Sequence, residues 1–124
     1  MSMSAKQKYK VLIDRLYEKT NAKDLPWESD IIDDEVVSTS IGDRTIEVGD
    51  ARNGSNEPIV KVTIRDSNGR IIEEFNDENL SGLLTGRPQF QSYWPLMKDL
   101  LSMAQRQATG ADKALDEIIE ALTG

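Results

Sequence analysis

Apolar residues recur at two different spacings along this 124-residue chain, and the change of spacing separates helical from extended parts. Near the start the apolar positions lie three, one, three and one residues apart, which places them on one face of an α-helix. The helix is expected to begin at Ser4, which can cap its first turn, and to continue to about Thr20. It must end before Pro26, because proline disfavours the α conformation in the residue before it. The apolar positions are Tyr9, Leu12, Ile13, Leu16 and Tyr17.

From residue 35 to residue 75 the period is two, which is typical of strands with one dry face and one wet face. Gly42-Asp43 and Asp66–Gly69 are typical hairpin turns, so two successive hairpins predict an antiparallel meander of four strands. Because one face of this sheet is polar, the other needs a covering layer. The turn-rich segment Gly49–Glu57 is expected to form a loop that is long enough to be mobile. The predicted strands are Glu35–Ile41, Arg44–Val48, Ile59–Arg65 and Arg70–Phe75.

The remainder of the chain returns to helical spacing. Residues 76–91 are expected to form an ordered connection with one helical turn, after which Ser92 is placed to cap a helix with Pro95 in its first turn. That helix is expected to end at Gly110, and a last helix to begin at Asp112. The fold class is therefore α+β, one domain over residues 1–124 in the order α-β-β-β-β-α-α. The last helix has Leu115, Ile118, Ile119 and Leu122 in register.

The chain contains no histidine and no cysteine, which excludes several kinds of active site. Ser–His–Asp and Cys–His nucleophilic sites, H-E-x-x-H zinc sites and thiolate metal sites cannot be built from it. The sequence therefore predicts a protein that is not an enzyme and binds no cofactor. An enzyme that uses carboxylates alone remains an alternative.

Charge is distributed unevenly around a net of −7. Residues 1–23 carry six bases against two acids, residues 24–50 carry nine acids against Arg44 alone, and residues 111–124 carry four acids against Lys113. An acidic protein repels the nucleic-acid backbone, so direct DNA or RNA binding is not expected. No segment has the run of apolar residues that a membrane span or a secretory signal needs, and a cytoplasmic location is expected.

Three short motifs resemble ligand-binding loops but depart from them in content. Asp66–Arg70 begins like a calcium loop, yet its glycine is fourth rather than sixth, so a hairpin turn is the better interpretation. Gly82–Arg87 lacks the Lys-Ser/Thr of a phosphate loop and has three residues between its glycines. The acidic stretch could hold Mg²⁺ or Ca²⁺, but consecutive acids are more often solvated. Its acids are Asp30, Asp33, Asp34 and Glu35.

Two sets of side chains are candidates for binding. Arginines on strands and their connections could hold a nucleotide or another anion, because guanidinium groups bind phosphates and carboxylates bidentately. Large apolar residues at and before the helix from Ser92 are candidates for an oligomer interface, since that helix is apolar on more than one side. The candidate anion-binding residues are Arg44, Arg65, Arg70 and Arg87, with Arg52 nearby in sequence. The candidate interface residues are Trp27, Phe90, Trp94 and Leu101.

The two ends of the chain resemble those of a family of short bacterial proteins of unknown function found in chromosomes and mobile elements. The resembling segments are Tyr9–Thr20 with the following Leu25–Glu28, and Met103–Asp116. In that family an antiparallel strand region of similar length lies between them. The resemblance implies a compact α+β domain of bacterial type and supplies no activity or site residues.

Three functions follow as expectations. The first is a non-catalytic protein-interaction module that self-associates, most simply as a dimer, or binds a protein partner. The second is a module that sequesters a nucleotide or other anion, by analogy with phage and mobile-element proteins that blunt host immunity. The third is an acidic nucleic-acid mimic, motivated by the net charge of −8 over residues 24–50.

Overall fold

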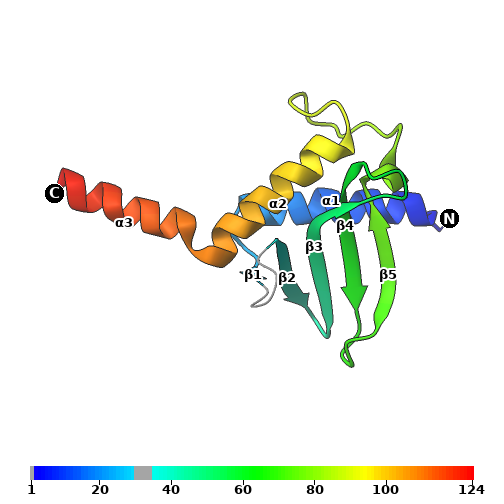
Figure 1. Ribbon diagram of the computed structural model, residues 1–124, viewed down its shortest axis with the longest axis horizontal. Coiled ribbons are helices and arrows are strands. Elements are labelled where there is room, and N and C mark those ends of the chain that lie inside the picture. Colours follow the sequence, from blue (N-terminus) through cyan, green and yellow to red (C-terminus); the bar gives the residue numbers. More distant parts are fainter. Residues whose placement is uncertain (1, 30–34) are drawn as a thin grey trace.

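The computed structural model describes residues 2–29 and 35–124, and it has the predicted α+β architecture with an N-terminal helix, an antiparallel sheet and two C-terminal helices (Figure 1). Among these residues no helix is long and apolar enough to cross a membrane. The elements in chain order are α1 (Ala5–Asn21), β1 (Glu28–Ser29), β2 (Val36–Ile41), β3 (Arg44–Arg52), β4 (Pro58–Arg65), β5 (Ile71–Asn76), the 3-10 helix η1 (Asp77–Leu80), α2 (Tyr93–Thr109) and α3 (Ala111–Thr123).

The first helix begins where the sequence predicts. Ser4 is its N-cap: the Ser4 hydroxyl accepts a hydrogen bond from the Gln7 amide at 3.2 Å, and the Gln7 side chain accepts one from the Ser4 amide at 3.1 Å. This capping box satisfies two backbone donors that a helix start would otherwise leave unpaired. Ser92 also occupies the N-cap of α2, as predicted, although its side chain makes no capping hydrogen bond.

The sheet is an antiparallel meander in the order β1-β2-β3-β4-β5, so the prediction of four strands is wrong by one. The additional strand, β1, has two residues and pairs Glu28 with Ser38 and Ser29 with Val37. Two residues are too few to show a period of two, which is why the sequence pattern could not reveal it.

The loop predicted for residues 49–57 is also shorter than expected. Strand β3 continues to Arg52 and pairs with β4 as far as Pro58, which leaves residues 53–57 as the turn. Gly49 interrupts the hydrophobic alternation in the sequence, yet it lies within strand β3. Glycine suits this position because a Cβ there would lie 2.9 Å from the Val36 side chain. Asn53 closes the turn, since its side-chain oxygen accepts hydrogen bonds from the Ser55 and Glu57 amides at 2.9 Å each.

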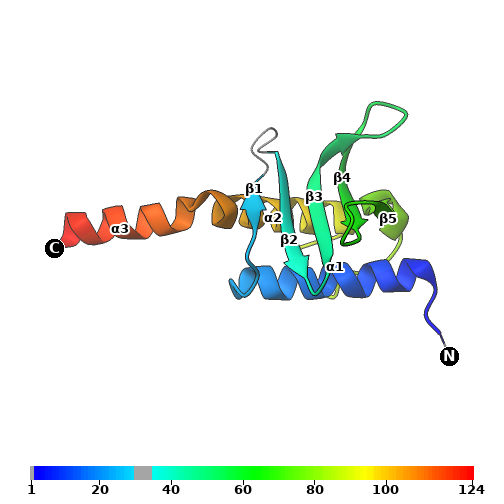
Figure 2. The same ribbon diagram turned by 90° about the horizontal axis from the view of Figure 1, so that it is seen from below.

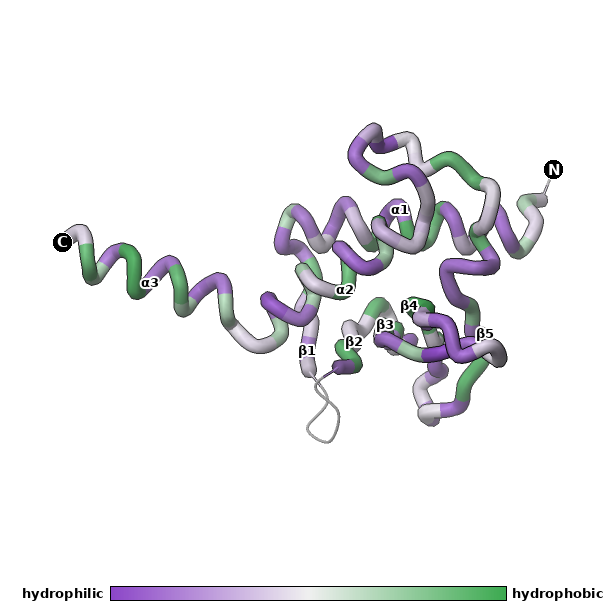
Figure 3. Tube along the Cα trace, turned by 45° about the horizontal axis from the view of Figure 1, so that its top comes forward, coloured by the Kyte–Doolittle hydropathy of each residue, from purple (hydrophilic) through white to green (hydrophobic). Residues whose placement is uncertain are grey.

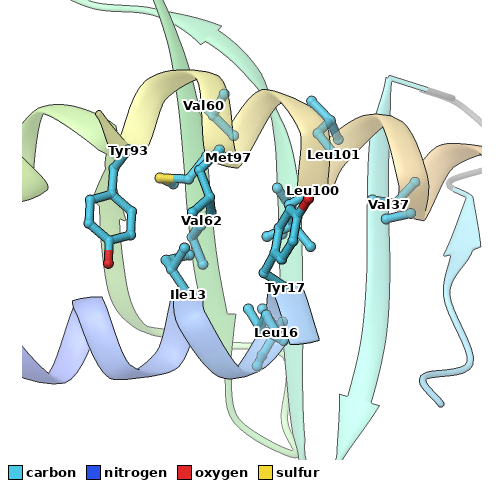
Figure 4. Packing of buried hydrophobic residues seen from close by; sticks show 14 of the residues in the cluster. Ile13, Leu16, Tyr17, Val37, Val60, Val62, Tyr93, Met97, Leu100 and Leu101 are labelled. Atoms are coloured by element: carbon cyan, nitrogen blue, oxygen red, sulfur yellow. The ribbon is translucent and has the colours of Figure 1, made fainter. Parts of the chain in front are cut away.

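Helices α1 and α2 run across the strands and enclose one hydrophobic core with the inner face of the sheet (Figures 1 and 4). The opposite face of the sheet carries polar side chains, among which Arg65 and Glu47 form an ion pair at 2.9 Å. This arrangement confirms that one face of the meander is covered and the other is not. The most deeply buried core residues include Ile13, Leu16, Val37, Val48, Val60, Val62, Phe75, Leu96, Met97, Leu100 and Leu101.

Two tyrosines join the covering helices through polar contacts. The Tyr17 hydroxyl of α1 donates to Asp99 of α2 at 2.6 Å, and the Tyr93 hydroxyl of α2 donates to Asp14 of α1 at 2.7 Å. Burial, followed by the hydrogen bond to Asp99, raises the pKa of Tyr17 to about 12. At neutral pH both phenols are protonated and donate these hydrogen bonds, which join α1 to α2.

Replacing each of two buried threonines by valine is expected to change the free energy of unfolding in opposite directions. The Thr39 hydroxyl is buried without a hydrogen-bond partner among the residues that the structure describes, whereas the Thr20 hydroxyl accepts from the Trp27 indole at 2.9 Å. Thr39→Val is expected to raise the free energy of unfolding by about 1 kcal/mol, because it removes an unsatisfied polar group. Thr20→Val should lower it by about 1–3 kcal/mol, because the indole N–H loses its acceptor. Urea unfolding measures both; equal changes of the same sign would contradict this reading.

Candidate functional site

Three of the four candidate anion-binding arginines lie at one end of the sheet. The strand register pairs Thr45, next to Arg44, with Arg65, and Arg65 with Ile71, next to Arg70. Each guanidinium group already contacts a carboxylate, which lowers the positive charge that an external anion would meet. The carboxylate partners of Arg44, Arg65 and Arg70 are Asp43, Glu47 and Asp66, at 3.1, 2.9 and 3.3 Å.

The fourth candidate, Arg87, is separate from these three. Its guanidinium carbon lies 4.5 Å from the centroid of the Tyr17 ring, a cation–π contact, and Phe90 meets the same ring edge-on at 5.7 Å. Arg87 and Phe90 therefore hold the connection before α2 against α1. Three of the predicted anion-binding residues thus share one end of the sheet, but Arg44 and Arg65 point to opposite faces of it, and the fourth residue lies elsewhere.

Asp66–Arg70 is a hairpin turn, as predicted. The Asp66 carboxylate accepts from the backbone amides of Asn68 and Arg70 at 2.9 and 3.0 Å, and Gly69 adopts a φ of +82°. Hydrogen bonds from Arg70 and Asn68 hold the pKa of Asp66 below its ordinary value. Because these oxygens are engaged by the turn itself, the calcium-like start of the motif is explained by local structure.

The acids proposed as possible ligands are not brought together in the described part of the chain. Asp30, Asp33 and Asp34 lie outside the described residues. Residues 2–29 and 35–124 contain no group of three or more acids placed to share a metal ion. Glu73 and Glu74 point to opposite faces of β5, as their adjacent positions in a strand require: Glu73 accepts from the Tyr9 hydroxyl at 3.0 Å, and Glu74 accepts from Thr63 at 3.2 Å.

Two of the four candidate interface residues offer little surface. Trp27 and Leu101 are 5% and 2% exposed and belong to the core cluster, so these two candidates are corrected: both are apolar enough for an interface, but the fold of one chain already covers them. Phe90 is half-buried against Tyr17. Trp94 keeps 39% of its surface, with the Lys98 ammonium 6.0 Å from its ring centroid.

Four of the exposed large hydrophobic side chains of the described chain lie on α3. This helix continues from α2 and projects away from the sheet, at the end of the molecule opposite the N-terminus (Figures 1 and 2). None of its residues is buried, and hydrophobic and hydrophilic segments alternate along it (Figure 3). Leu115, Ile118, Ile119 and Leu122 are 48%, 56%, 57% and 82% exposed. Their spacing of three, one and three places all four on one side of the helix.

Gly110 sets the direction in which α3 leaves the body. It adopts the left-handed conformation with φ +73° and ψ +18°, which glycine reaches without steric cost, and its amide donates to the carbonyls that end α2. Arg106 then pairs with Asp112 across the break, its Nε lying 2.8 Å from the carboxylate. Beyond this break α3 projects away from the sheet, so the core does not cover its apolar face (Figures 1 and 2).

The sequence predicted the helix α3 but not that its apolar face is exposed. The register of the four aliphatic residues predicted an amphipathic helix, and nothing in the pattern distinguishes a face that packs on its own core from one that does not. The available signal was indirect: the helices at residues 4–20 and 92–110 already supply enough apolar surface to cover one face of a meander sheet.

Comparisons with protein-family models, with curated proteins and with solved structures find no match for this chain.

Proposed function

We propose that this chain is a non-catalytic protein-interaction module that associates with a second copy of itself through the apolar face of α3. The observation that carries the proposal is the exposure of four aliphatic side chains on one side of a helix from which no residue is buried. Contiguous apolar patches of this kind, flanked by polar residues, mark interaction sites. A dimer is the simplest closed assembly.

The energetics of α3 favour a partner. Burying the exposed parts of its four large side chains is worth about 4–7 kcal/mol per helix, at about 1.5–3 kcal/mol for each fully buried aliphatic residue. An isolated helix of α3's length, 13 residues, is marginal in water, because most helical stability comes from packing of an apolar face. A second copy that covers this face therefore stabilises the helix and the assembly together.

The composition supports an interaction role over catalysis. The chain lacks histidine and cysteine, the residues on which most general-base and nucleophilic sites depend. Three of its candidate anion-binding arginines are engaged by neighbouring carboxylates. The acidic charge of α3, with four acids and one lysine over residues 111–124, keeps the exposed helix hydrated until its partner binds.

Removal of α3 tests the proposal. The full chain is expected to sediment as a dimer whose population grows with concentration, and a chain ending at Gly110 is expected to sediment as a monomer. Because α3 contributes no residue to the core cluster, the shortened chain should unfold at nearly the same urea concentration as the full monomer. A full chain that sediments as a monomer at every concentration would contradict the proposal, as would a shortened chain that dimerises equally well.

A further inference from the structure

A second apolar surface of the described chain lies at the N-terminal half of α1. A groove of about 650 Å³ opens there between the helix and the ends of strands β3, β4 and β5. Since a cavity of about 150 Å³ holds one benzene-sized apolar group, the groove is large enough for several aliphatic side chains. Its apolar lining comes from Ala5, Tyr9 and Leu12 on α1 and from Ile64 and Ile72 on the sheet.

The inner wall of this groove is held firmly. The Tyr9 ring stacks on Phe75 with centroids 4.1 Å apart and an interplanar angle of 7°, and its hydroxyl donates to Glu73. This contact closes the groove toward the core, while Ile72 keeps 49% of its surface beyond it. The groove is therefore a preformed apolar hollow on the inner face of the sheet, beside the N-terminal half of α1.

The charged residues that line the groove are Lys8, Arg44 and Glu73. Arg44 is paired with Asp43, whereas Lys8 makes no ion pair within residues 2–29 and 35–124. Residues 1–23, which supply the helical wall, carry six bases against two acids, whereas residues 111–124 carry four acids against one base. The helical wall of the groove and α3 thus both present apolar side chains and belong to segments of opposite net charge. Two α3 helices packed on each other would instead bring two acidic segments together.

We infer that the groove beside α1 receives the apolar face of α3 from a second copy of the chain. The inference rests on the proposed self-association and assigns the surface that α3 binds. Because α3 leaves the body at the end opposite the N-terminal half of α1, it points away from its own groove (Figures 1 and 2). Two copies placed side by side in opposite directions exchange α3 helices, and the same contact forms twice about a two-fold axis.

The absence of cysteine from the chain permits a specific cross-linking test. Full-length Ile72→Cys and Ile119→Cys variants are mixed, oxidised under mild conditions and separated by mass. The expected product is a disulfide between one Ile72→Cys chain and one Ile119→Cys chain, formed in large excess over either homodimer. A Leu84→Cys variant, whose native side chain is 82% exposed and lies outside both surfaces, is the control and should cross-link weakly with Ile119→Cys.

The outcomes separate this inference from the proposed function. If Ile119→Cys chains cross-link mainly with each other, α3 pairs with α3, so the groove assignment is wrong while self-association stands. The same conclusion follows if the unsubstituted protein dimerises but Ile72→Cys cross-links with Ile119→Cys no better than Leu84→Cys does. If the full chain does not dimerise, both proposals fail.

Discussion

Ile118→Asp is expected to weaken self-association on the order of 100-fold, the range seen when an apolar anchor at the centre of an interface is removed. Ile118 lies in the middle of α3, and 56% of its surface is available to a partner. In the dimer that surface loses its water, so an aspartate in the middle of the apolar face would be desolvated, which is costly. Sedimentation equilibrium over a range of protein concentrations measures the change in Kd.

Lys113→Gln is the matched control for this substitution. It changes the net charge of α3 by the same amount, but Lys113 lies on the polar side of the helix and is exposed. We expect its effect on Kd to be no more than about fivefold, as for an exposed charge. Equal weakening by the two variants would show that charge alone, and not the apolar face, governs association.

Leu100→Ala is expected to lower the free energy of unfolding by about 2–5 kcal/mol, the range for removing a buried leucine side chain. Leu100 is on the inner side of α2, has 0% exposure and belongs to the core cluster shared by α1, α2 and the sheet. The neighbouring elements are tied together by the Tyr17–Asp99 and Tyr93–Asp14 contacts, so the cavity can collapse only in part. Urea unfolding at a concentration where the protein is monomeric gives the value.

Leu84→Ala provides the same chemical change at the surface. Leu84 is 82% exposed in the connection before α2, and the expected change in the free energy of unfolding is within about 0.5 kcal/mol. If Leu84→Ala lowered the free energy of unfolding as much as Leu100→Ala, the Leu84 side chain would have to be buried and not exposed. A loss below about 1 kcal/mol at Leu100 would place the core elsewhere.

Long, strongly periodic elements were predictable from sequence, and short or interrupted ones were not. The helix from Ser4 and the hairpins at Gly42 and Gly69 follow from capping, spacing and turn chemistry, all of which act locally. Strand β1 is held by its pairing with β2, and the end of β3 by its pairing with β4. Such pairing depends on residues distant in sequence, which is why a local pattern missed the first and ended the second too early.

The sequence predicted that the candidate site is an apolar interface, but it did not predict which residues form it. The sequence favoured an oligomer interface at Trp27, Phe90, Trp94 and Leu101, residues that are large or lie on a second side of a helix. Trp27 and Leu101 are covered by the tertiary fold of a single chain, whereas Trp94 stays partly exposed. The face of α3 satisfied the same hydrophobic pattern, and its exposure follows from the break at Gly110, whose geometric consequence requires the fold to be known.

The most direct test of the account is amide hydrogen exchange of α3 as a function of protein concentration. Residues 111–123 are expected to exchange rapidly in dilute protein, because a 13-residue helix without a partner is marginal, and to become protected as the dimer forms. Protection of α1 and α2 core amides should change far less over the same range. Exchange of α3 that is equally fast at all concentrations would contradict the claim that a second copy covers this helix.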